Sequence, residues 1–265
     1  MSSPPALLSL TVGTEPGEFA ATTIETDSGV PRGISPQLWS RLLRILHDQS
    51  GKGAAPTVLD CGGGSGSLAV PLAACGAQVT VVDVSIDALA TLLRRASEAG
   101  VSPRVTGMQG DAEALSEVLP AAQFDIVLAH GVLESVPGPG QAISQIAAVL
   151  RPGGVASLLV ANPVAMVIGR LLAGEVAAAL ETFRRAPAAY SVEAAASQCH
   201  QAGLTVESID GIGVFAELVP GVELDRPGAM LALAELEMAA STVPPYRDIA
   251  SRLHLIARRP YPGTG

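Results

Sequence analysis

The most informative stretch of the chain is Thr57-Val-Leu-Asp-Cys-Gly-Gly-Gly-Ser-Gly66. Its short apolar run predicts a buried strand, and the glycines that follow predict a sharp turn into a helix over residues 67–75. Glycine lets the backbone turn tightly and approach a ligand without a Cβ in the way. The stretch therefore predicts a strand–turn–helix unit that cradles a nucleotide-like ligand.

The strand–helix alternation continues to residue 161. Apolar strands that alternate with helices are typical of a parallel sheet covered on both faces. Right-handed crossovers then bring the carboxyl ends of the strands to one edge, where ligands bind. The predicted strands are 57–60, 78–83, 104–109, 124–129 and 155–161, and the predicted helices are 36–49, 67–75, 86–99, 112–119 and 141–150.

Beyond residue 162 the pattern is looser. Helices are expected over 164–183, 192–201 and 230–240, a sixth strand over 204–219 with a break at Asp210-Gly211, and a seventh over 253–257. The expected fold class is α/β, a doubly wound, mostly parallel, seven-stranded sheet with helices on both faces. One domain over 1–265 fits best, with an arm and helix at 1–50, a ligand-binding core at 51–162, and lid insertions at 163–190 and 219–248.

Composition excludes two classes of protein. Hydrophobic residues make up 48% of the 265 residues and charged residues 15%, a balance that excludes intrinsic disorder. The net charge is −9, whereas a non-specific nucleic-acid binder carries a basic surplus. An acidic total still allows a local basic pocket.

Cysteine spacing and the amino-terminal region bear on location. Cys61, Cys75 and Cys199 form no C-x-x-C pair, so neither a disulfide framework nor a metal site is expected, and a reducing cytoplasm is favoured. The first basic residue is Arg32, so the start of the chain does not resemble a secretory signal. The uncharged stretch 152–169 is interrupted by Asn162-Pro163, which indicates two buried elements and no membrane partner.

The glycine turn fits two kinds of ligand. Gly64-x-Gly66-x-x-Ala69, with Asp83 as an acid for the ribose, satisfies the dinucleotide fingerprint. Asp60-x-Gly62-x-Gly64-x-Gly66 instead resembles the acid-plus-glycine motif of class I S-adenosylmethionine (SAM) methyltransferases. SAM has no phosphate but carries a cationic amino group and a sulfonium, and Asp60 supplies an acid at the end of the first strand.

Three further loops strengthen the second interpretation. Asp83 ends the second strand, where a carboxylate can accept both ribose hydroxyls, and Gly110-Asp-Ala112 follows the third, where this class commonly binds the adenine edge. Leu150-Arg-Pro-Gly-Gly154 resembles the turn by which many of these enzymes enter the fifth strand. With four features in order, the chain resembles class I SAM-dependent methyltransferases, which implies SAM as cofactor and S-adenosylhomocysteine as product.

A narrower resemblance extends over nearly the whole chain. His130-Gly-Val-Leu-Glu134, Gly211-x-x-Val-Phe215, Pro245-Tyr246 and His254-x-x-Ala-Arg258 are similar to the tRNA carboxymethoxyuridine methyltransferase family. That family methylates the carboxylate of a modified wobble uridine to a methyl ester. Because a carboxylate is already a competent nucleophile, alignment and exclusion of water are the main tasks, and no catalytic residue is assigned.

The resemblance implies two sets of site residues. His130 belongs to both sets and is favoured as a lining of the cofactor pocket over a catalytic base. Glu134, which belongs to neither set, is favoured as structural. The candidate acceptor-pocket residues are His130, Asn162, Arg184, Arg185, Tyr246 and Arg252. The candidate cofactor-binding residues are Arg32, Asp60, Gly62, Gly64, Gly66, Asp83, Val84, Asp111, Ala112 and His130.

The chain departs from the family at three places. In place of the lysine-rich stretch of better-known members, this chain has Thr182-Phe-Arg-Arg-Ala-Pro187. Ser251 occupies the position where the family has an arginine, although Arg252 follows it, and Gly213 occupies the position of an expected basic residue. Alternatives therefore stay open. The acceptor is either a tRNA wobble uridine or a small carboxylate, and the rival acceptor is a small secondary metabolite. The competing classes are an NAD-binding oxidoreductase and a non-catalytic SAM-fold subunit.

Overall fold

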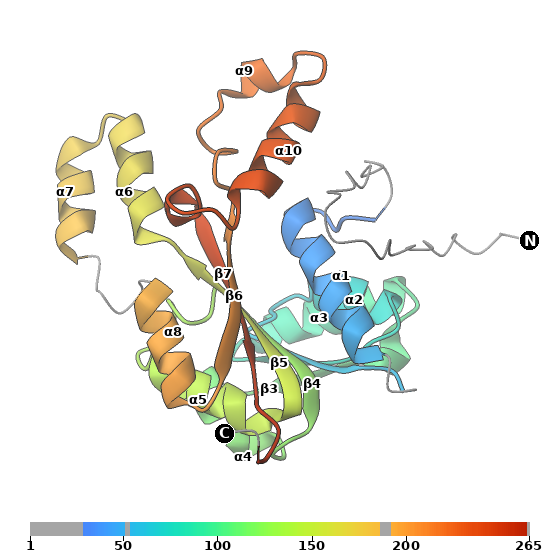
Figure 1. Cartoon of the computed structure of the whole chain (residues 1–265). Coiled ribbons are helices and arrows are strands. Elements are labelled where there is room, and N and C mark those ends of the chain that lie inside the picture. Colours follow the sequence, from blue (N-terminus) through green and yellow to red (C-terminus); the bar gives the residue numbers. More distant parts are fainter. Residues whose placement is uncertain (1–28, 51–53, 186–191, 264–265) are drawn as a thin grey trace, which may run out of the picture.

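The computed structural model describes residues 29–50, 54–185 and 192–263, so most of the predicted amino-terminal arm and residues 186–190 of the first predicted lid insertion lie outside the described residues. Its centre is a seven-stranded sheet in the order β3-β2-β1-β4-β5-β7-β6 (Figure 1). The strands are β1 (Thr57–Cys61), β2 (Gln78–Asp83), β3 (Val105–Gln109), β4 (Phe124–His130), β5 (Leu150–Ala161), β6 (Thr205–Ile212) and β7 (Arg252–Arg258). Strands β1 to β5 are parallel, and β7 runs antiparallel to both β5 and β6. The predicted α/β fold is confirmed.

Helices cover both faces of the sheet because successive strand residues point to opposite sides. In β4, Ile126 and Leu128 pack with α1 (Pro36–Ser50), α2 (Ala69–Ala74) and α3 (Ile86–Glu98). Val127 and Ala129 pack on the other face with α4 (Leu115–Val118), α5 (Pro139–Val149) and α8 (Val192–Gln201). The sheet is therefore packed between two apolar layers, one on each face, which hold its strands in place. Short 3₁₀ turns η1 (Ser102–Arg104) and η2 (Ala112–Ala114) flank β3.

Two helical units project beyond the sheet on the side away from α4 and α5 (Figure 1). The first consists of α6 (Pro163–Leu172) and α7 (Val176–Arg185), where one helix was predicted over 164–183. The helix ends because Gly174 takes a φ of +78°, its N–H binds the Leu171 carbonyl, and the N–H of Glu175 binds that of Arg170. The second unit consists of α9 (Gly221–Leu224) and α10 (Ala229–Ala240), followed by η4 (Arg247–Ile249).

The prediction for the sixth strand, residues 204–219 with a break at Asp210-Gly211, was wrong about both the break and the end of the strand. β6 passes through Asp210-Gly211 without interruption and stops at Ile212, so residues 213–219 are not a strand. The carboxylate of Glu237 in α10 accepts the N–H groups of Val214, Phe215 and Ala216 at 2.7–2.8 Å. Backbone donors that a neighbouring strand would bind are thus used to anchor α10. The predicted helix 112–119 is also shorter, since its first turn is η2.

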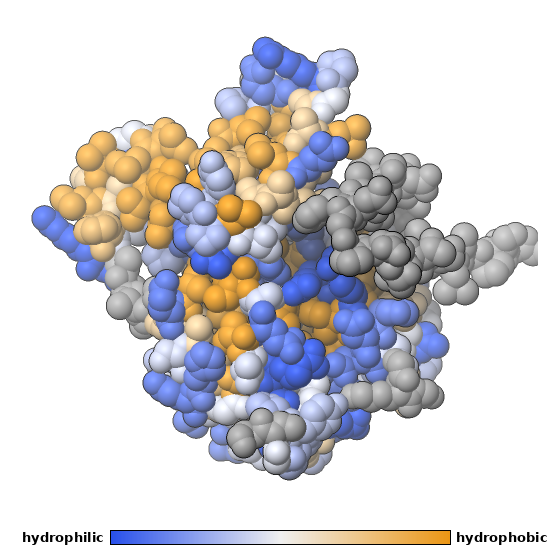
Figure 2. Space-filling model, in the orientation of Figure 1, coloured by the Kyte–Doolittle hydropathy of each residue, from blue (hydrophilic) through white to orange (hydrophobic). Residues whose placement is uncertain are grey.

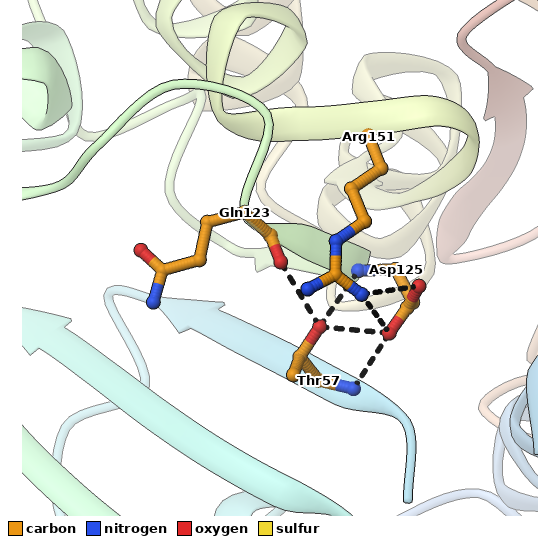
Figure 3. Close-up of polar contacts among 4 residues, drawn as sticks. All are labelled: Thr57, Gln123, Asp125 and Arg151. Atoms are coloured by element: carbon orange, nitrogen blue, oxygen red, sulfur yellow. Dashed lines mark hydrogen bonds and ion pairs between the residues drawn. The ribbon is translucent and has the colours of Figure 1, made fainter. Parts of the chain in front are cut away.

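A polar cluster joins the amino ends of β1, β4 and β5 (Figure 3). The carboxylate of Asp125 accepts the N–H and hydroxyl of Thr57 at 2.9 and 2.8 Å and the guanidinium of Arg151 at 3.0 Å. Burial alone would raise the pKa of Asp125, but these donors lower it below its ordinary value. Thr57, Asp125 and Arg151 therefore satisfy one another at this end of the sheet. Among the described residues, no helix is long and apolar enough to cross a membrane.

Candidate functional site

The glycine turn after β1 is shaped by packing at two positions and by open space at a third. Gly62, Gly64 and Gly66 have φ of +67°, +53° and +79°, which L side chains rarely adopt. A Cβ would lie 2.5 Å from Val132 Cγ2 at Gly62 and 2.3 Å from Leu92 Cδ1 at Gly66. At Gly64 it would meet only Asp83 Oδ2, at 3.8 Å. Among the described residues, Gly64 is thus where this turn is open for a ligand.

Asp83 links the ends of the first three strands. Its Oδ2 accepts the N–H of Gly64 at 2.8 Å and its Oδ1 accepts that of Ser85 at 2.9 Å. The N–H of Gly110, after β3, donates to the Asp83 carbonyl at 3.1 Å. A carboxylate has about four acceptor positions, so this half-buried group retains capacity for two more donors.

Asp60 is a buried acid directly beneath the turn. It is 3% exposed, and a Cβ on Gly63 would lie 2.5 Å from its carboxylate. Burial first, and the neighbouring Asp83 second, raise the pKa of Asp60 to about 7. Burying an ionised carboxylate is costly unless a cation or hydrogen-bond donors compensate. A ligand that carries positive charge would supply what this position lacks.

The loops after β2 and β3 offer an apolar surface beside a polar turn. Val84 and Ile86 are 66% and 63% exposed, which gives this edge two apolar side chains that a ligand could cover. The side-chain amide of Gln109 donates to the Val84 carbonyl at 3.2 Å. Asp111 is exposed and caps η2 by accepting the N–H of Glu113 at 2.9 Å, while Ala112 is buried.

A hydrogen-bonded chain of side chains runs from the end of β4 across the sheet. His130 Nε2 lies 2.9 Å from the hydroxyl of Ser157 in β5, and this hydroxyl lies 2.7 Å from Nε2 of His254 in β7. Both Nδ1 atoms are buried and have no hydrogen-bond partner among the described residues. Burial first, and Arg252 second, lower the pKa of His130 to about 4, and burial lowers that of His254 to about 3. His130 is therefore neutral near pH 7.

The sequence did not predict the hydrogen bonds that link His130, Ser157 and His254. Ser157 and His254 occupy strand positions between core residues, and they are 97 residues apart. Only the placement of β7 next to β5 brings them together. Glu134 also acts within the scaffold, since its Oε1 accepts the N–H of Ala161 at 3.2 Å, although its Oε2 is buried without a partner in the described part of the chain.

The acceptor candidates divide into those at the sheet edge and those away from it. Arg252 begins β7, opposite Ala161 and Ile212, and its guanidinium lies 3.9 Å from the position of a Cβ on Gly131. Its positive charge acts on His130. Arg252 therefore lies next to the end of β4, with its side chain exposed.

Asn162 and Tyr246 lie at the base of the projecting helices. Asn162 caps α6 by accepting the N–H of Val164 at 3.0 Å, and its amide donates to the carbonyls of Asp248 and Ala250 at 2.9 and 2.7 Å. The polar atoms of Asn162 are thus engaged in joining two loops. Tyr246 is half exposed, with its ring centroid 6.0 Å from that of Phe215.

Three arginines that were predicted to belong to the site lie away from the candidate residues at the sheet edge. Arg185 pairs with Glu181 at 2.7 Å on the surface of α7, and Arg184 beside it is exposed. Arg32 lies in an exposed turn before α1. None of the three forms a hydrogen bond or ion pair with the glycine turn or Arg252 in the described part of the chain. In residues 29–50, 54–185 and 192–263, no group of three or more His, Cys, Asp or Glu side chains is placed to hold a metal ion.

Comparisons with known proteins agree with this geometry. Residues 58–154 match the family described as "Methyltransferase domain". The tRNA 5-carboxymethoxyuridine methyltransferase of Escherichia coli K12 is 28% identical over 230 residues, which are 84% of this chain and 87% of the relative. A ubiquinone biosynthesis O-methyltransferase of Burkholderia orbicola is 34% identical over 101 residues, 38% of this chain and 42% of the relative.

The solved structures show the same fold. An S-adenosylmethionine-dependent methyltransferase from Mesorhizobium loti superposes with a TM-score of 0.55 at 18% identity, over 83% of this chain and 97% of that one. These structures show the fold, and the cofactor SAM follows from the methyltransferase domain that residues 58–154 match. The chain is thus a class I SAM-dependent methyltransferase that resembles the tRNA 5-carboxymethoxyuridine methyltransferase.

Proposed function

We propose that this enzyme methylates a carboxylate and that SAM binds at the edge formed by the carboxyl ends of β1 to β4. The observation that supports the cofactor position best is Asp60, a buried acid beneath the glycine turn. Its pKa is raised to about 7, and a bound cation would stabilise its charged form. SAM, when bound, supplies a methyl group activated by a positive sulfonium, together with a cationic amino group.

Each part of this edge has a proposed task. Asp60 compensates the positive charge of the cofactor. Gly64 has no side chain, so the cofactor can approach the backbone closely at this position. Asp83 uses its remaining acceptor positions for the ribose hydroxyls. Val84, Asp111 and Ala112 contact the adenine, the apolar Val84 by packing and Asp111 by accepting a hydrogen bond. The remaining proposed cofactor contacts are Arg32, Gly62, Gly66 and His130.

The proposed acceptor position is beside Arg252 and His130. The guanidinium of Arg252 would orient a carboxylate with charge-assisted hydrogen bonds. The acceptor oxygen then forms a bond to the methyl carbon while the carbon–sulfur bond breaks, and the electron pair stays on the sulfur of S-adenosylhomocysteine. No proton has to be removed from a carboxylate, which fits a histidine that is neutral and poorly basic.

The projecting helices are proposed to select the acceptor. They correspond to the described parts of the insertions 163–190 and 219–248, within a single domain whose core spans 51–162. Asn162 and Tyr246 lie at the base of these insertions and Arg184 and Arg185 on them. We place this chemistry in the cytoplasm, where the reduced state of the cysteines would be maintained.

Two acceptors carry a suitable carboxylate. A modified wobble uridine of tRNA is supported by the similarity to the E. coli enzyme. A small carboxylic acid is supported by the net charge of −9, which disfavours a polyanionic partner. Mass spectrometry of tRNA nucleosides from a strain lacking the gene tests the first, because a lost methyl ester is expected only if tRNA is the acceptor.

Calorimetry with S-adenosylhomocysteine tests the cofactor position. Asp83→Ala should weaken binding by roughly 1.5–3 kcal/mol, because it removes charge-assisted hydrogen bonds to the ribose. Asp87→Ala, an exposed acid in the first turn of α3, is the matched control and should bind as the natural protein does. Unchanged affinity in Asp83→Ala, or stabilisation by NAD and none by S-adenosylhomocysteine, would contradict the assignment.

A further inference from the structure

We propose that the methyl acceptor is a small carboxylic acid with an apolar body, whose carboxylate binds Arg252 and whose body lies against α6, α7 and α10. The inference rests on the proposed methylation of a carboxylate and narrows its acceptor to one chemical class. Three features of the described residues support it: the exposed apolar side chains of the projecting helices, the pairing of four of their five arginines with acids, and Arg252 at their base, which forms no ion pair.

The projecting helices expose apolar side chains that nothing in the described part of the chain covers. Leu172, Val176 and Phe183 are 68%, 65% and 70% exposed on α6 and α7, and Met230 and Leu231 are both 59% exposed on α10. Figure 2 shows hydrophobic side chains across the α6–α7 unit and the lower part of α10. Apolar patches of this kind mark binding surfaces, because exposing them to water is unfavourable.

The arginines of these helices do not form a surface suited to phosphates. Arg170, Arg185, Arg226 and Arg247 pair with Glu175, Glu181, Glu223 and Asp248 at 3.3, 2.7, 3.0 and 2.8 Å. Of the five arginines in the two insertions, Arg184 alone has no acidic partner among the described residues. A tRNA acceptor would require several unpaired cations, each neutralising a phosphate.

One cation lies where both projecting units begin. Arg252 is opposite Ala161, directly before the cap of α6, and opposite Ile212, directly before the loop that Glu237 of α10 holds. It forms no ion pair within the described residues, and its side chain is exposed. A single positive charge below apolar helices is complementary to a molecule with one carboxylate and an apolar body.

The base that carries this arrangement is firmly connected. Asn162 binds the carbonyls of Asp248 and Ala250, and the N–H of Ser251 binds the carbonyl of Gly213 at 2.9 Å. The loops that precede α6, follow β6 and precede β7 are therefore joined to one another. Arg252 and the roots of the helices keep a common position, so the carboxylate and the apolar body can be bound together.

The experiment uses the full chain, SAM and a series of carboxylic acids: acetate, hexanoate and decanoate, with decanol and decylamine as non-acid probes. Methyl esters and S-adenosylhomocysteine are both quantified. We expect kcat/KM to rise about three- to fourfold for each methylene buried, so that decanoate far exceeds acetate. Arg252→Gln should raise the KM for decanoate at least tenfold without changing the affinity for S-adenosylhomocysteine.

A double variant and a matched control test the apolar contacts. Val164→Ser/Met238→Ser replaces exposed apolar residues near the base of α6 and the end of α10, and it should lower kcat/KM for decanoate about tenfold while acetate is unaffected. Leu93→Ser, on the surface of α3 and 49% exposed like Val164, should leave decanoate turnover unchanged. Binding of S-adenosylhomocysteine verifies that each variant is folded.

The outcomes separate failure of this inference from failure of the proposed function. A methyl ester on tRNA, with an inert acid series, would overturn the inference and leave carboxylate methylation standing. Methylation of decanol or decylamine but of no acid would overturn both. A dimer that Val164→Ser/Met238→Ser converts to a monomer, with decanoate turnover unchanged, would identify the apolar faces as an interface between copies and overturn the inference.

Discussion

Two aspartates in adjacent strands of the sheet have opposite environments. At the amino end, the buried Asp125 accepts three donors from Thr57 and Arg151, and its pKa is lowered (Figure 3). At the carboxyl end, Asp60 is more deeply buried and lies beside another acid, and its pKa is raised to about 7. The difference is both in burial, which is deeper at Asp60, and in the partners, since only Asp125 has hydrogen-bond donors that favour its charged form.

The carboxyl end of the sheet is therefore less stable than it could be, which is expected where a ligand binds. Buried polar groups are nearly always satisfied by partners, and exceptions need an explanation. Among the described residues, buried atoms without a hydrogen-bond partner lie at both ends, Gln123 Oε1 at the amino end and atoms of His130 and Glu134 at the carboxyl end, but it is the carboxyl end that also holds the buried acid Asp60 with a raised pKa. Perturbed groups gathered at one edge are typical of a binding site, and a ligand would supply the missing partners.

The largest effect is expected from matched glycine substitutions at the two ends. Gly62 and Gly76 both have positive φ, +67° and +99°, but a Cβ would lie 2.5 Å from Val132 at Gly62 and meet nothing within 4 Å at Gly76. Gly76→Ala should cost about 1 kcal/mol of unfolding free energy from backbone strain alone. Gly62→Ala should cost roughly 3 kcal/mol, because the stiff Val132 cannot move aside.

Urea denaturation measures both variants. Gly62→Ala should also abolish binding of S-adenosylhomocysteine, whereas Gly76→Ala should bind it normally. Equal losses of stability would show that Val132 adapts and that the turn tolerates a side chain.

Replacing each aspartate by asparagine sharpens the comparison. Asp60→Asn should raise the free energy of unfolding at pH 8 by roughly 2–3 kcal/mol, because it removes a charge that burial disfavours. It should weaken binding of S-adenosylhomocysteine more than tenfold. Asp125→Asn should instead cost about 1–3 kcal/mol of stability through lost hydrogen bonds and leave binding unchanged. Stability effects of the same sign would contradict the contrast.

The pH dependence of cofactor affinity follows from the pKa of Asp60. The group is protonated below about pH 7 in the free protein, and a cationic ligand lowers its pKa. Binding therefore releases a proton, and affinity should increase up to about tenfold per pH unit from pH 5.5 to 7. Calorimetry in buffers of different ionisation enthalpy counts the proton. Asp60→Asn should show no such slope, and a slope retained in that variant would assign the proton elsewhere.

The smallest effect is expected from the arginines at the two ends. Arg151→Gln should cost only about 0.5–1 kcal/mol, since its side chain is 46% exposed and water screens the pair with Asp125. Because the pKa of folded Asp125 is lowered, this contribution is present above the unfolded pKa near 4 and disappears as the pH falls through the folded value. Arg252→Gln should leave stability unchanged. Thermal unfolding between pH 2.5 and 7 measures both.

The sequence was sufficient for the core but not for the insertions. Apolar runs, glycine turns and helix periodicity predicted β1 to β5 and their helices, because each signal is local. The segment after Ile212 was taken for a strand because its apolar residues look like one, whereas a distant glutamate, Glu237, binds its backbone. The break between α6 and α7 depends on Gly174, whose tolerance inside a helix cannot be judged from spacing alone.

By itself, the sequence determined the class of fold, the glycine turn and the acids Asp60, Asp83 and Asp111 at consecutive strand ends, since parallel strands bring their carboxyl ends to one edge whatever the details of packing. Only the tertiary structure decided which of these groups are satisfied. The raised pKa of Asp60, the chain from His130 through Ser157 to His254, and the position of Arg252 beside β4 all depend on the antiparallel β7 and on burial. Burial and partners arise from contacts between residues far apart in the sequence, and no local pattern encodes them.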